Sequence, residues 1–256
     1  MQRLDLALVS KGLFASREKA NQAIKKGIIS VDGKIIIKPS FQVELTQDIL
    51  VLEVMLKYVS WGGMKLERAI DYFNLDFKDK VVLDIGASTG GFTDCALQHG
   101  AKEVYAVDVG RMQLADSLRT DFRVHSYEQT NICDFNVDVN FDYLVMDVSF
   151  VSITKIIPSL LKFLNNNNYL ICLFKPQFEV GKIKIKNGVI KDEKIHKEVV
   201  VNLINFIKEM GLYVNDLTYS TQKGKSGNIE YLALISKNKI CKNYNVAEII
   251  KESHNM

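Results

Sequence analysis

The chain has 256 residues, of which 47% are hydrophobic and 25% charged, and its formal net charge at pH 7 is +3. This composition supplies enough apolar surface for a packed core and excludes a largely disordered chain. Because the net charge is small, affinity for nucleic acid must come from local clusters of basic residues. No apolar run approaches the ~20 residues that cross a bilayer, and the amino terminus has no apolar segment long enough for a signal peptide. We therefore expect a cytoplasmic protein without a membrane span.

The four cysteines show no spacing typical of a metal site. Cys95, Cys133, Cys172 and Cys241 lie far apart, and no CxxC pair occurs among them. Most of them stand in apolar or strand-like surroundings, which favours buried, reduced thiols. The sequence predicts no bound metal.

The first 56 residues predict a small α+β domain. The stretch RLDLALVSKGLFASREKANQAIKKG indicates two short helices, the second of them preceded by Ser16 as its N-cap. Two β-branched runs follow on either side of Asp32 and Gly33. An Asp-Gly pair in this setting is a strong signal for a β-hairpin.

Basic residues stand between the apolar ones throughout this domain. Charge alone does not decide whether they form an ordinary solvated face or bind RNA. The order helix, helix, hairpin resembles the small RNA-binding module named after a protein of the small ribosomal subunit. That resemblance implies RNA binding by shape and by phosphate contacts. The candidate RNA-binding residues are Arg3, Ser16, Arg17, Lys19, Lys25, Lys26 and Lys34.

Residues 57–64 are expected to link this domain to a larger one, because Ser60-Trp61-Gly62-Gly63 breaks the periodicity and a helix restarts at about Met64. Over residues 65–246, strand-like and helix-like segments alternate, which is typical of parallel strands joined by right-handed helical crossovers. The last two strand-like segments, LYVNDLTYS and GNIEYLALIS, suit an antiparallel hairpin at the edge of the sheet. The sequence thus predicts a Rossmann-like α/β domain, followed by a tail over residues 247–256.

The stretch DIGASTGGFTD joins a predicted strand to a predicted helix and indicates a bound cofactor. A dinucleotide site would have glycine at Ser88, and the carboxylate of Asp84 would repel a pyrophosphate. The same carboxylate would attract the ammonium group of S-adenosylmethionine, which carries no phosphate. Asp108 ends the next strand, where an acid can accept hydrogen bonds from the ribose hydroxyls of either cofactor. These residues favour S-adenosylmethionine over a dinucleotide.

A hydrolase is the weaker alternative at the same stretch. Gly86-Ala-Ser88-Thr-Gly90 fits the nucleophile motif G-x-S-x-G, and Ser88, Asp147 and His196 follow the order of an α/β-hydrolase triad. However, the nucleophile turn should follow several strands of its sheet, whereas this strand is the first of its domain. The sequence also has no HGGG-like segment for an oxyanion hole.

Four further polar residues fall where a parallel sheet places its active site, namely Lys65, Asp147, Lys175 and Glu230. Taken singly, each has an ordinary explanation as a cap or a solvated charge. Their order matches the K-D-K-E tetrad of ribose 2'-O-methyltransferases related to the heat-shock enzyme FtsJ. The chain resembles the TlyA-type family, described both as haemolysins and as rRNA 2'-O-methyltransferases acting on cytidines. The resemblance rests on SREKANQAI, DIGASTGGFTD, AVDVG, DVSFVSI, KPQFEVG and GNIEYL.

The resemblance implies a Rossmann-like class I methyltransferase sheet with an antiparallel edge hairpin. It further implies methylation of rRNA, free or in ribosomal subunits, with no obligate protein partner. Because a 2'-hydroxyl must lose its proton as it attacks the methyl group, a base is required. We expect Lys175 to be that base and Asp147 to orient it, while Lys65 and Glu230 position the groups and tune their charge. The candidate cofactor-binding residues are Asp84, Gly86, Ser88, Gly90, Gly91, Phe92, Thr93, Asp108, Asn131 and Asp147.

The haemolysin description adds an alternative from another class, a membrane-active protein. Nothing in the sequence is long and apolar enough to span a bilayer. We therefore expect any lytic effect to be indirect.

Overall fold

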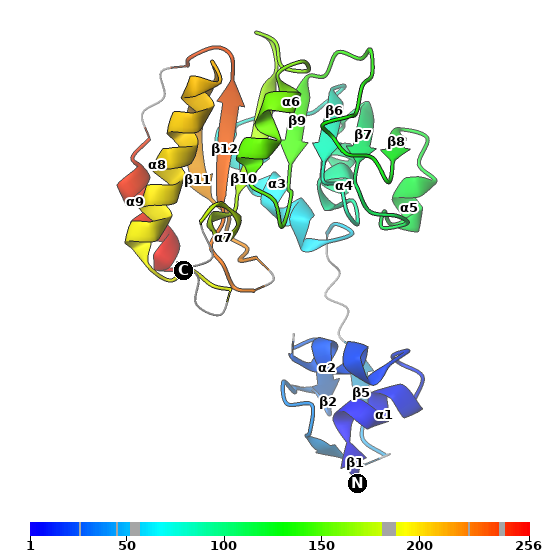
Figure 1. Ribbon diagram of the computed structural model, residues 1–256. Helices are drawn as coiled ribbons and strands as arrows, with labels where there is room; N and C mark the ends of the chain where they lie inside the picture. The colour runs from blue at the N-terminus through cyan, green and yellow to red at the C-terminus, as the bar shows by residue number, and fades with distance from the viewer. Residues whose placement is uncertain (26, 45, 52–56, 181–187, 225, 241–243) are drawn as a thin grey trace. The chain divides into compact units, whose positions relative to one another are not determined.

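The computed structural model describes residues 1–25, 27–44, 46–51, 57–180, 188–224, 226–240 and 244–256 (Figure 1). The chain divides into two compact units, Met1–Leu56 and Lys57–Met256. The division falls where the predicted hairpin region ends and the predicted join begins.

The first unit packs two helices against short strands. The helices are α1 (Leu4–Ser10) and α2 (Arg17–Lys25). The strands form two small sheets: β1 (Gln2–Arg3) pairs with β4 (Gln42–Val43), and β2 (Ile29–Val31) lies between β3 (Lys34–Ile35) and β5 (Ile49–Val51). Apolar side chains from both helices and from the strands bury one another and form the core of this unit.

Two local predictions for this unit are confirmed. The hydroxyl of Ser16 accepts a hydrogen bond from the backbone N–H of Lys19 at 3.3 Å, as an N-cap does. Asp32 and Gly33, between β2 and β3, have φ angles of 49° and 77°. A tight hairpin turn of this kind requires positive φ at both central residues, and β2 and β3 pair antiparallel on either side of it.

The second unit is built on a seven-stranded sheet in the order β8-β7-β6-β9-β10-β12-β11. Strands β6 to β10 are parallel to one another, whereas β12 runs antiparallel to both β10 and β11. The predicted hairpin is therefore present, but only β11 lies at the edge. The strands are β6 (Val81–Ile85), β7 (Glu103–Val107), β8 (Val124–Tyr127), β9 (Tyr143–Met146), β10 (Tyr169–Phe174), β11 (Tyr213–Tyr219) and β12 (Tyr231–Ser236).

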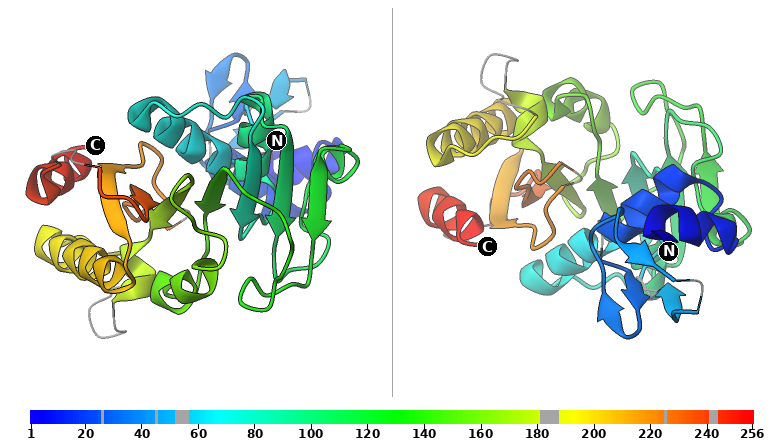
Figure 2. Two further views of the ribbon diagram at one scale, coloured as in Figure 1. Left: turned by 90° about the horizontal axis from the view of Figure 1, so that it is seen from above. Right: turned by 90° about the horizontal axis from the view of Figure 1, so that it is seen from below.

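Helices cover both faces of this sheet (Figure 2). Successive residues of a strand point to opposite faces. Leu83 and Leu144 belong to the core on one face of the sheet, together with side chains of α6, α8 and α9, whereas Val82 and Val145 belong to the core on the other face, with side chains of α3 and α4. The helices are α3 (Trp61–Phe73), α4 (Gly91–Gln98), α5 (Asp116–Arg119), the 3-10 helix η1 (Ile153–Lys155), α6 (Ile157–Leu160), α7 (Pro176–Glu179), α8 (Glu193–Glu209) and α9 (Val246–His254).

Residues 57–64, expected to be a linker, belong to the second unit. The side chain of Tyr58 is buried, and the backbone N–H of Val59 donates to the carboxylate of Asp94 in α4 at 2.8 Å. Ser60 caps α3, which starts at Trp61 rather than near Met64. The expected boundary was wrong because a serine before two glycines breaks the periodicity whether it begins a helix or a linker.

The expected tail, residues 247–256, is also corrected. Asn245 caps α9 through its side-chain oxygen, which accepts hydrogen bonds from the backbone N–H groups of Ala247 and Glu248. Ile249 and Ile250 are buried against the cluster that contains α8. A stripe of apolar residues at helical spacing therefore anchors most of this segment to the sheet.

We predict that Gly63→Ala destabilises the second unit. A Cβ atom at this position would lie 2.3 Å from Cγ of the buried Tyr58 ring, and overpacking of this kind costs about 1–3 kcal/mol. Urea unfolding should show the loss. Gly62→Ala is the matched control, since the nearest atom to its Cβ is the Ser60 hydroxyl at 3.3 Å. Equal stability of the two variants would contradict the predicted contact.

Candidate active site

The sheet topology brings the predicted catalytic residues to one edge. Asp147 follows β9 and Lys175 follows β10, so both lie at the carboxyl ends of parallel strands. Glu230 comes just before β12, and because β12 is antiparallel its start lies at the same edge. The register confirms this, since Tyr231 pairs with Phe174, the last residue of β10. Chain order also reverses between β6 and β9, which is where open α/β sheets bind ligands.

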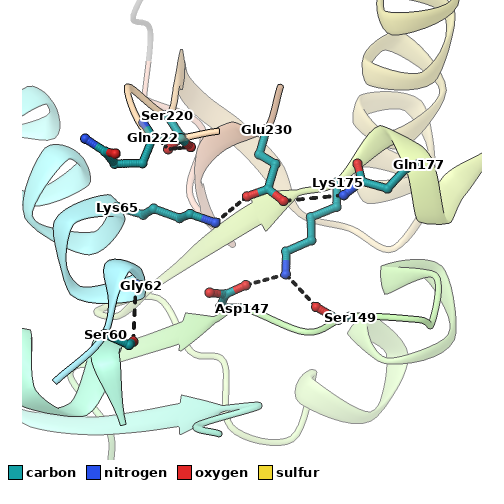
Figure 3. A network of polar contacts seen from close by, with 10 residues as sticks. All are labelled: Ser60, Gly62, Lys65, Asp147, Ser149, Lys175, Gln177, Ser220, Gln222 and Glu230. Carbon is teal, nitrogen blue, oxygen red and sulfur yellow. Dashed lines mark hydrogen bonds and ion pairs between the residues drawn. The ribbon is translucent and has the colours of Figure 1, made fainter. Parts of the chain in front are cut away.

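Two ion pairs meet at this edge (Figure 3). Lys65 of α3 approaches Glu230, with Nζ and Oε2 2.5 Å apart. Lys175 approaches Asp147, with Nζ and Oδ1 2.5 Å apart. Lys65, Lys175 and Glu230 are buried, whereas Asp147 is partly exposed. The structure thus brings together all four residues of the predicted tetrad, as two separate pairs.

Ser149 is a member of this site that the sequence prediction missed. The Lys175 ammonium donates a hydrogen bond to the Ser149 hydroxyl at 2.8 Å. The Oδ1 atom of Asp147 has no aligned hydrogen bond among the described residues, although it lies in contact with Nζ. The expected orienting role of Asp147 stays a prediction, and Ser149 is a further partner of the amine that makes the aligned hydrogen bond. The sequence signal that could have identified Ser149 is its position in DVSF, two residues after Asp147.

Two more residues missed by the prediction hold the carboxylate of Glu230. The amide of Gln177, in α7, donates to Oε1 at 3.4 Å. A Cβ atom on Gly224 would lie 2.5 Å from the same oxygen. Glycine at this position leaves the room that the carboxylate occupies while it faces Lys65.

The turn after β6 holds its backbone in conformations that favour glycine. Gly86 and Gly90 have φ angles of 80° and 91°, and Ser88 adopts 49°. A Cβ on Gly90 would also lie 2.3 Å from Cδ1 of Leu118. The turn leads into the N-terminus of α4 at Gly91. Its backbone can therefore approach a ligand closely.

Asp84 is a fully buried acid at the end of β6. Its Oδ2 accepts a hydrogen bond from the Thr93 hydroxyl at 2.6 Å, whereas Oδ1 has no partner among the described residues. Burial raises the pKa of Asp84 to about 7, opposed by the Thr93 hydrogen bond and assisted by the charge of Asp147. An unpaired carboxylate oxygen in such surroundings fits a cationic ligand group.

The other predicted cofactor-binding residues play mixed parts. The carboxylate of Asp108 accepts hydrogen bonds from the backbone N–H groups of Ser88 at 2.8 Å and Gly110 at 2.7 Å, which ties two loops together. Phe92 has a buried side chain, so only its backbone could face a ligand. Asn131 is exposed, and its side chain accepts a hydrogen bond from the backbone N–H of Cys133 at 3.0 Å.

The structure does not assemble the hydrolase triad. One ring nitrogen of the buried His196 contacts the Tyr231 hydroxyl at 2.8 Å, and the other contacts the backbone oxygen of Ile190 at 3.2 Å. The backbone N–H of Ser88 instead donates to Asp108. His196 is a core residue with both nitrogens in use, and the pattern in chain order was coincidental.

In the first unit, two predicted RNA-binding arginines share one buried acid. Arg3 and Arg17 each approach Asp5 at 2.9 Å, and the hydrogen bond from Arg3, together with Arg17, lowers the pKa of Asp5 to about 2. The predicted lysines Lys19, Lys25 and Lys34 are exposed, and Lys26 lies outside the described residues. Asp5 was not predicted, because its role appears only when the two arginines meet around it.

Residues 58–237 match the model of a family described as FtsJ-like methyltransferase. The chain belongs to this family. Residues 2–49 match the S4 domain, so the predicted family and fold class are both confirmed.

Relatives with similarity over most of their length include Hemolysin A of Brachyspira hyodysenteriae, which is 44% identical over 90% of this chain and 98% of its own. The 16S/23S rRNA (cytidine-2'-O)-methyltransferase TlyA of Mycobacterium tuberculosis is 36% identical over 90% of this chain and 87% of its own. A solved structure from Streptococcus thermophilus, described as a candidate hemolysin, superposes with a TM-score of 0.79 at 37% identity, covering 99% and 96% of the two chains.

Within the described part of the chain, no helix combines the length and apolar character that crossing a membrane requires. The same residues contain no group of three or more histidine, cysteine or acidic side chains placed to hold a metal ion. Of the cysteines, Cys95 and Cys172 are buried and Cys133 is exposed, while Cys241 lies outside the described residues.

We predict that Asp84→Asn stabilises the protein, and does so more strongly at high pH. The folded state holds the Asp84 proton up to about pH 7, whereas an unfolded chain releases it near 3.9. Stability therefore falls as pH rises through this interval, since folded protein binds more protons. Asparagine cannot ionise and escapes the loss.

Urea unfolding at pH 5 and pH 8, without added ligand, would measure the effect. Asp108→Asn serves as a control because that carboxylate is not buried. A stabilisation by Asp84→Asn that is equal at both pH values would contradict the prediction.

Proposed function

We propose that this protein transfers the methyl group of S-adenosylmethionine to the 2'-hydroxyl of a cytidine ribose in rRNA. The observation that carries the proposal is the convergence of the Lys65–Glu230 and Lys175–Asp147 pairs beside the glycine-rich turn. Cytidine as the target base is supported by relatives named rRNA (cytidine-2'-O)-methyltransferase, at 34–36% identity.

The turn after β6 has features that fit S-adenosylmethionine. The Oδ1 atom of Asp84 has no partner among the described residues and can accept a hydrogen bond from the ammonium group of the cofactor. The backbone from Gly86 to Gly91 leaves room for the cofactor to approach closely. Asp108 would accept hydrogen bonds from the ribose hydroxyls of the cofactor. Asn131, which follows β8, would border the same edge of the sheet. Thr93 acts through Asp84, and Phe92 through its backbone. The cofactor, when bound, supplies a methyl group on a positively charged sulfur.

Lys175 is the proposed base. Its amine accepts the proton that the 2'-hydroxyl loses as the oxygen attacks the methyl carbon, and it becomes an ammonium ion. Asp147, in contact with Nζ, stabilises the resulting positive charge. The Lys65–Glu230 pair places a second lysine beside the reacting groups without adding net charge. Holding these groups in line supplies the remaining acceleration through proximity.

The target base has a neighbouring platform in Phe150. Its side chain is 92% exposed, its φ is 65°, and its ring centroid lies 5.2 Å from that of Phe178. The Lys175 amine lies 6.0 Å from the Phe178 ring. Exposed aromatic rings beside a reaction centre stack well against unpaired bases.

The S4 unit is the proposed RNA anchor. Its exposed lysines and the two arginines held by Asp5 would contact phosphates, and Ser16 fixes the start of the helix that carries Arg17. Whether the substrate is free rRNA or a ribosomal subunit, the chemistry of these contacts is the same. The proposed rRNA substrate supports the expected cytoplasmic location. Leakage of dye from liposomes with purified protein would instead support the membrane-active alternative.

We predict that Lys175→Ala and Lys175→Arg both nearly abolish methyl transfer while RNA and cofactor still bind. A general base contributes ~10²–10⁴ in rate, and arginine keeps the charge but cannot accept the proton near neutral pH. Single-turnover methylation of an rRNA fragment at saturating concentrations measures the loss. Ser88→Ala is the control and should lose less. An active Lys175→Arg variant beside an inactive Ser88→Ala variant would sink the assignment.

We also predict that reversing the charge of Lys19 and Lys25 together weakens RNA binding and reduces its salt dependence. Each lost phosphate contact lowers the slope of log affinity against log salt by about 0.7–0.9. Affinity for S-adenosylmethionine, measured by calorimetry, should not change. The matched control reverses Lys78 and Lys208, two exposed lysines of the second unit. Equal RNA affinity in the two double variants would count against the S4 unit as anchor.

A further inference from the structure

We propose that Ser149 is a positioning residue that aims the Lys175 amine at the substrate hydroxyl. This proposal rests on the proposed role of Lys175 as the base. The observation behind it is the contrast between two contacts: Nζ donates an aligned hydrogen bond to Ser149 at 2.8 Å, while its closer neighbour Asp147 accepts no aligned hydrogen bond.

The geometry of an amine explains why the aligned contact matters. Beyond its bond to Cε, the Nζ atom has three tetrahedral positions, and rotation about the Cε–Nζ bond moves all three together. The hydrogen bond to Ser149 fixes one of them, and the Asp147 contact lies on another side. The remaining position is left for the proton of the substrate. A close charge attracts the amine but sets its rotation poorly, whereas a hydrogen bond is directional.

The chain holds Ser149 in a fixed place relative to Lys175. Directly after Ser149, Phe150 adopts a φ of 65°, a left-handed conformation that is costly for a bulky residue and persists where surrounding contacts enforce it. The Phe150 ring lies 5.2 Å from that of Phe178 in α7, and the segment that follows Phe150 is held by Glu179 at the end of the same helix. Its carboxylate accepts from the Ser152 hydroxyl at 2.5 Å and from the backbone N–H of Ile153 at 2.9 Å.

This arrangement closes a loop between the two strands that carry the reacting groups. Segment 147–153 follows β9, and α7 starts directly after Lys175 at the end of β10. Glu179 therefore clamps the segment that carries Ser149 to the helix that follows the base. A serine serving only as a solvated surface residue would need no such constraint.

The test compares Ser149→Ala with Ser149→Thr in the full chain. Ser149 is exposed, and one hydrogen bond of this kind contributes little to folding, so both variants should fold. We expect Ser149→Ala to slow single-turnover methylation of an rRNA fragment about 10- to 100-fold, as misalignment at a reaction centre does. Ser149→Thr, which keeps the hydroxyl, should recover most of the rate. Cofactor and RNA affinities should be unchanged in both.

The dependence of the rate on pH gives a readout that a merely structural role would not move. The groups that face the amine are Asp147 after β9, Glu230 before β12 and Lys65 on α3, and all stay in place in the variant. Because Ser149 accepts a hydrogen bond from the ammonium form, its loss disfavours that form. In Ser149→Ala, the rise of the methylation rate with pH should therefore occur at lower pH, and the maximal rate at high pH should be lower than in the native protein.

Ser117→Ala is the matched control, since Ser117 lies on α5, away from the tetrad; it should behave as the native protein. A Ser149→Ala variant with native rate and native pH profile overturns the proposal and leaves the proposed function standing. The proposal is also overturned if Ser149→Ala is slow and Ser149→Thr is equally slow. It is overturned as well if Ser149→Ala is slow but its rate depends on pH as that of the native protein does. A native protein that methylates no rRNA overturns the proposed function together with this inference.

Discussion

The antiparallel pairing of β12 with β10 is the constraint on which the site depends. Among the six pairings of the large sheet, this one and the β11–β12 pairing run against the parallel direction. Because β12 enters from the opposite end, its first residues lie beside the last residues of β10. Glu230 is thereby delivered to the edge where Lys175 and Asp147 already lie. A parallel strand in the same position would have placed Glu230 at the far end of the sheet.

Burial then determines how the charges are arranged at that edge. Removing lone charges from water is costly, so buried lysines and carboxylates are stable chiefly as neighbours of opposite charge. Lys65 and Glu230 are almost completely buried, and Gln177 and Gly224 complete the surroundings of the carboxylate. Asp84 differs, because one of its oxygens has no partner among the described residues. The site therefore combines two lysine–carboxylate ion pairs with one acid, Asp84, whose unpaired oxygen a cationic ligand group would contact.

The same principle operates on a smaller scale in the S4 unit. Asp5 is completely buried in α1 and is compensated by two arginines from outside that helix, Arg3 and Arg17. Arginine suits this task because its planar fork can bind a carboxylate and still present further donors. A buried acid thus fixes the direction of two exposed cations without neutralising all of their hydrogen-bonding capacity.

The sequence by itself determined the two-part organisation, the alternation of strands and helices, the Asp32–Gly33 turn and the order of the four tetrad residues. These features are local, or depend on spacing along the chain, and periodicity and turn chemistry report them directly. Tertiary structure alone decided that α3 starts at Trp61 and that residues 246–254 form a packed helix. It further decided that His196 is a core residue in contact with Tyr231 and Ile190, and not a catalytic partner of Ser88. It also decided that Ser149, rather than Asp147, makes the aligned contact with Lys175. The physical reason is that hydrogen-bond direction, burial and close packing depend on which distant residues the strand pairings bring together, and no local pattern contains that information.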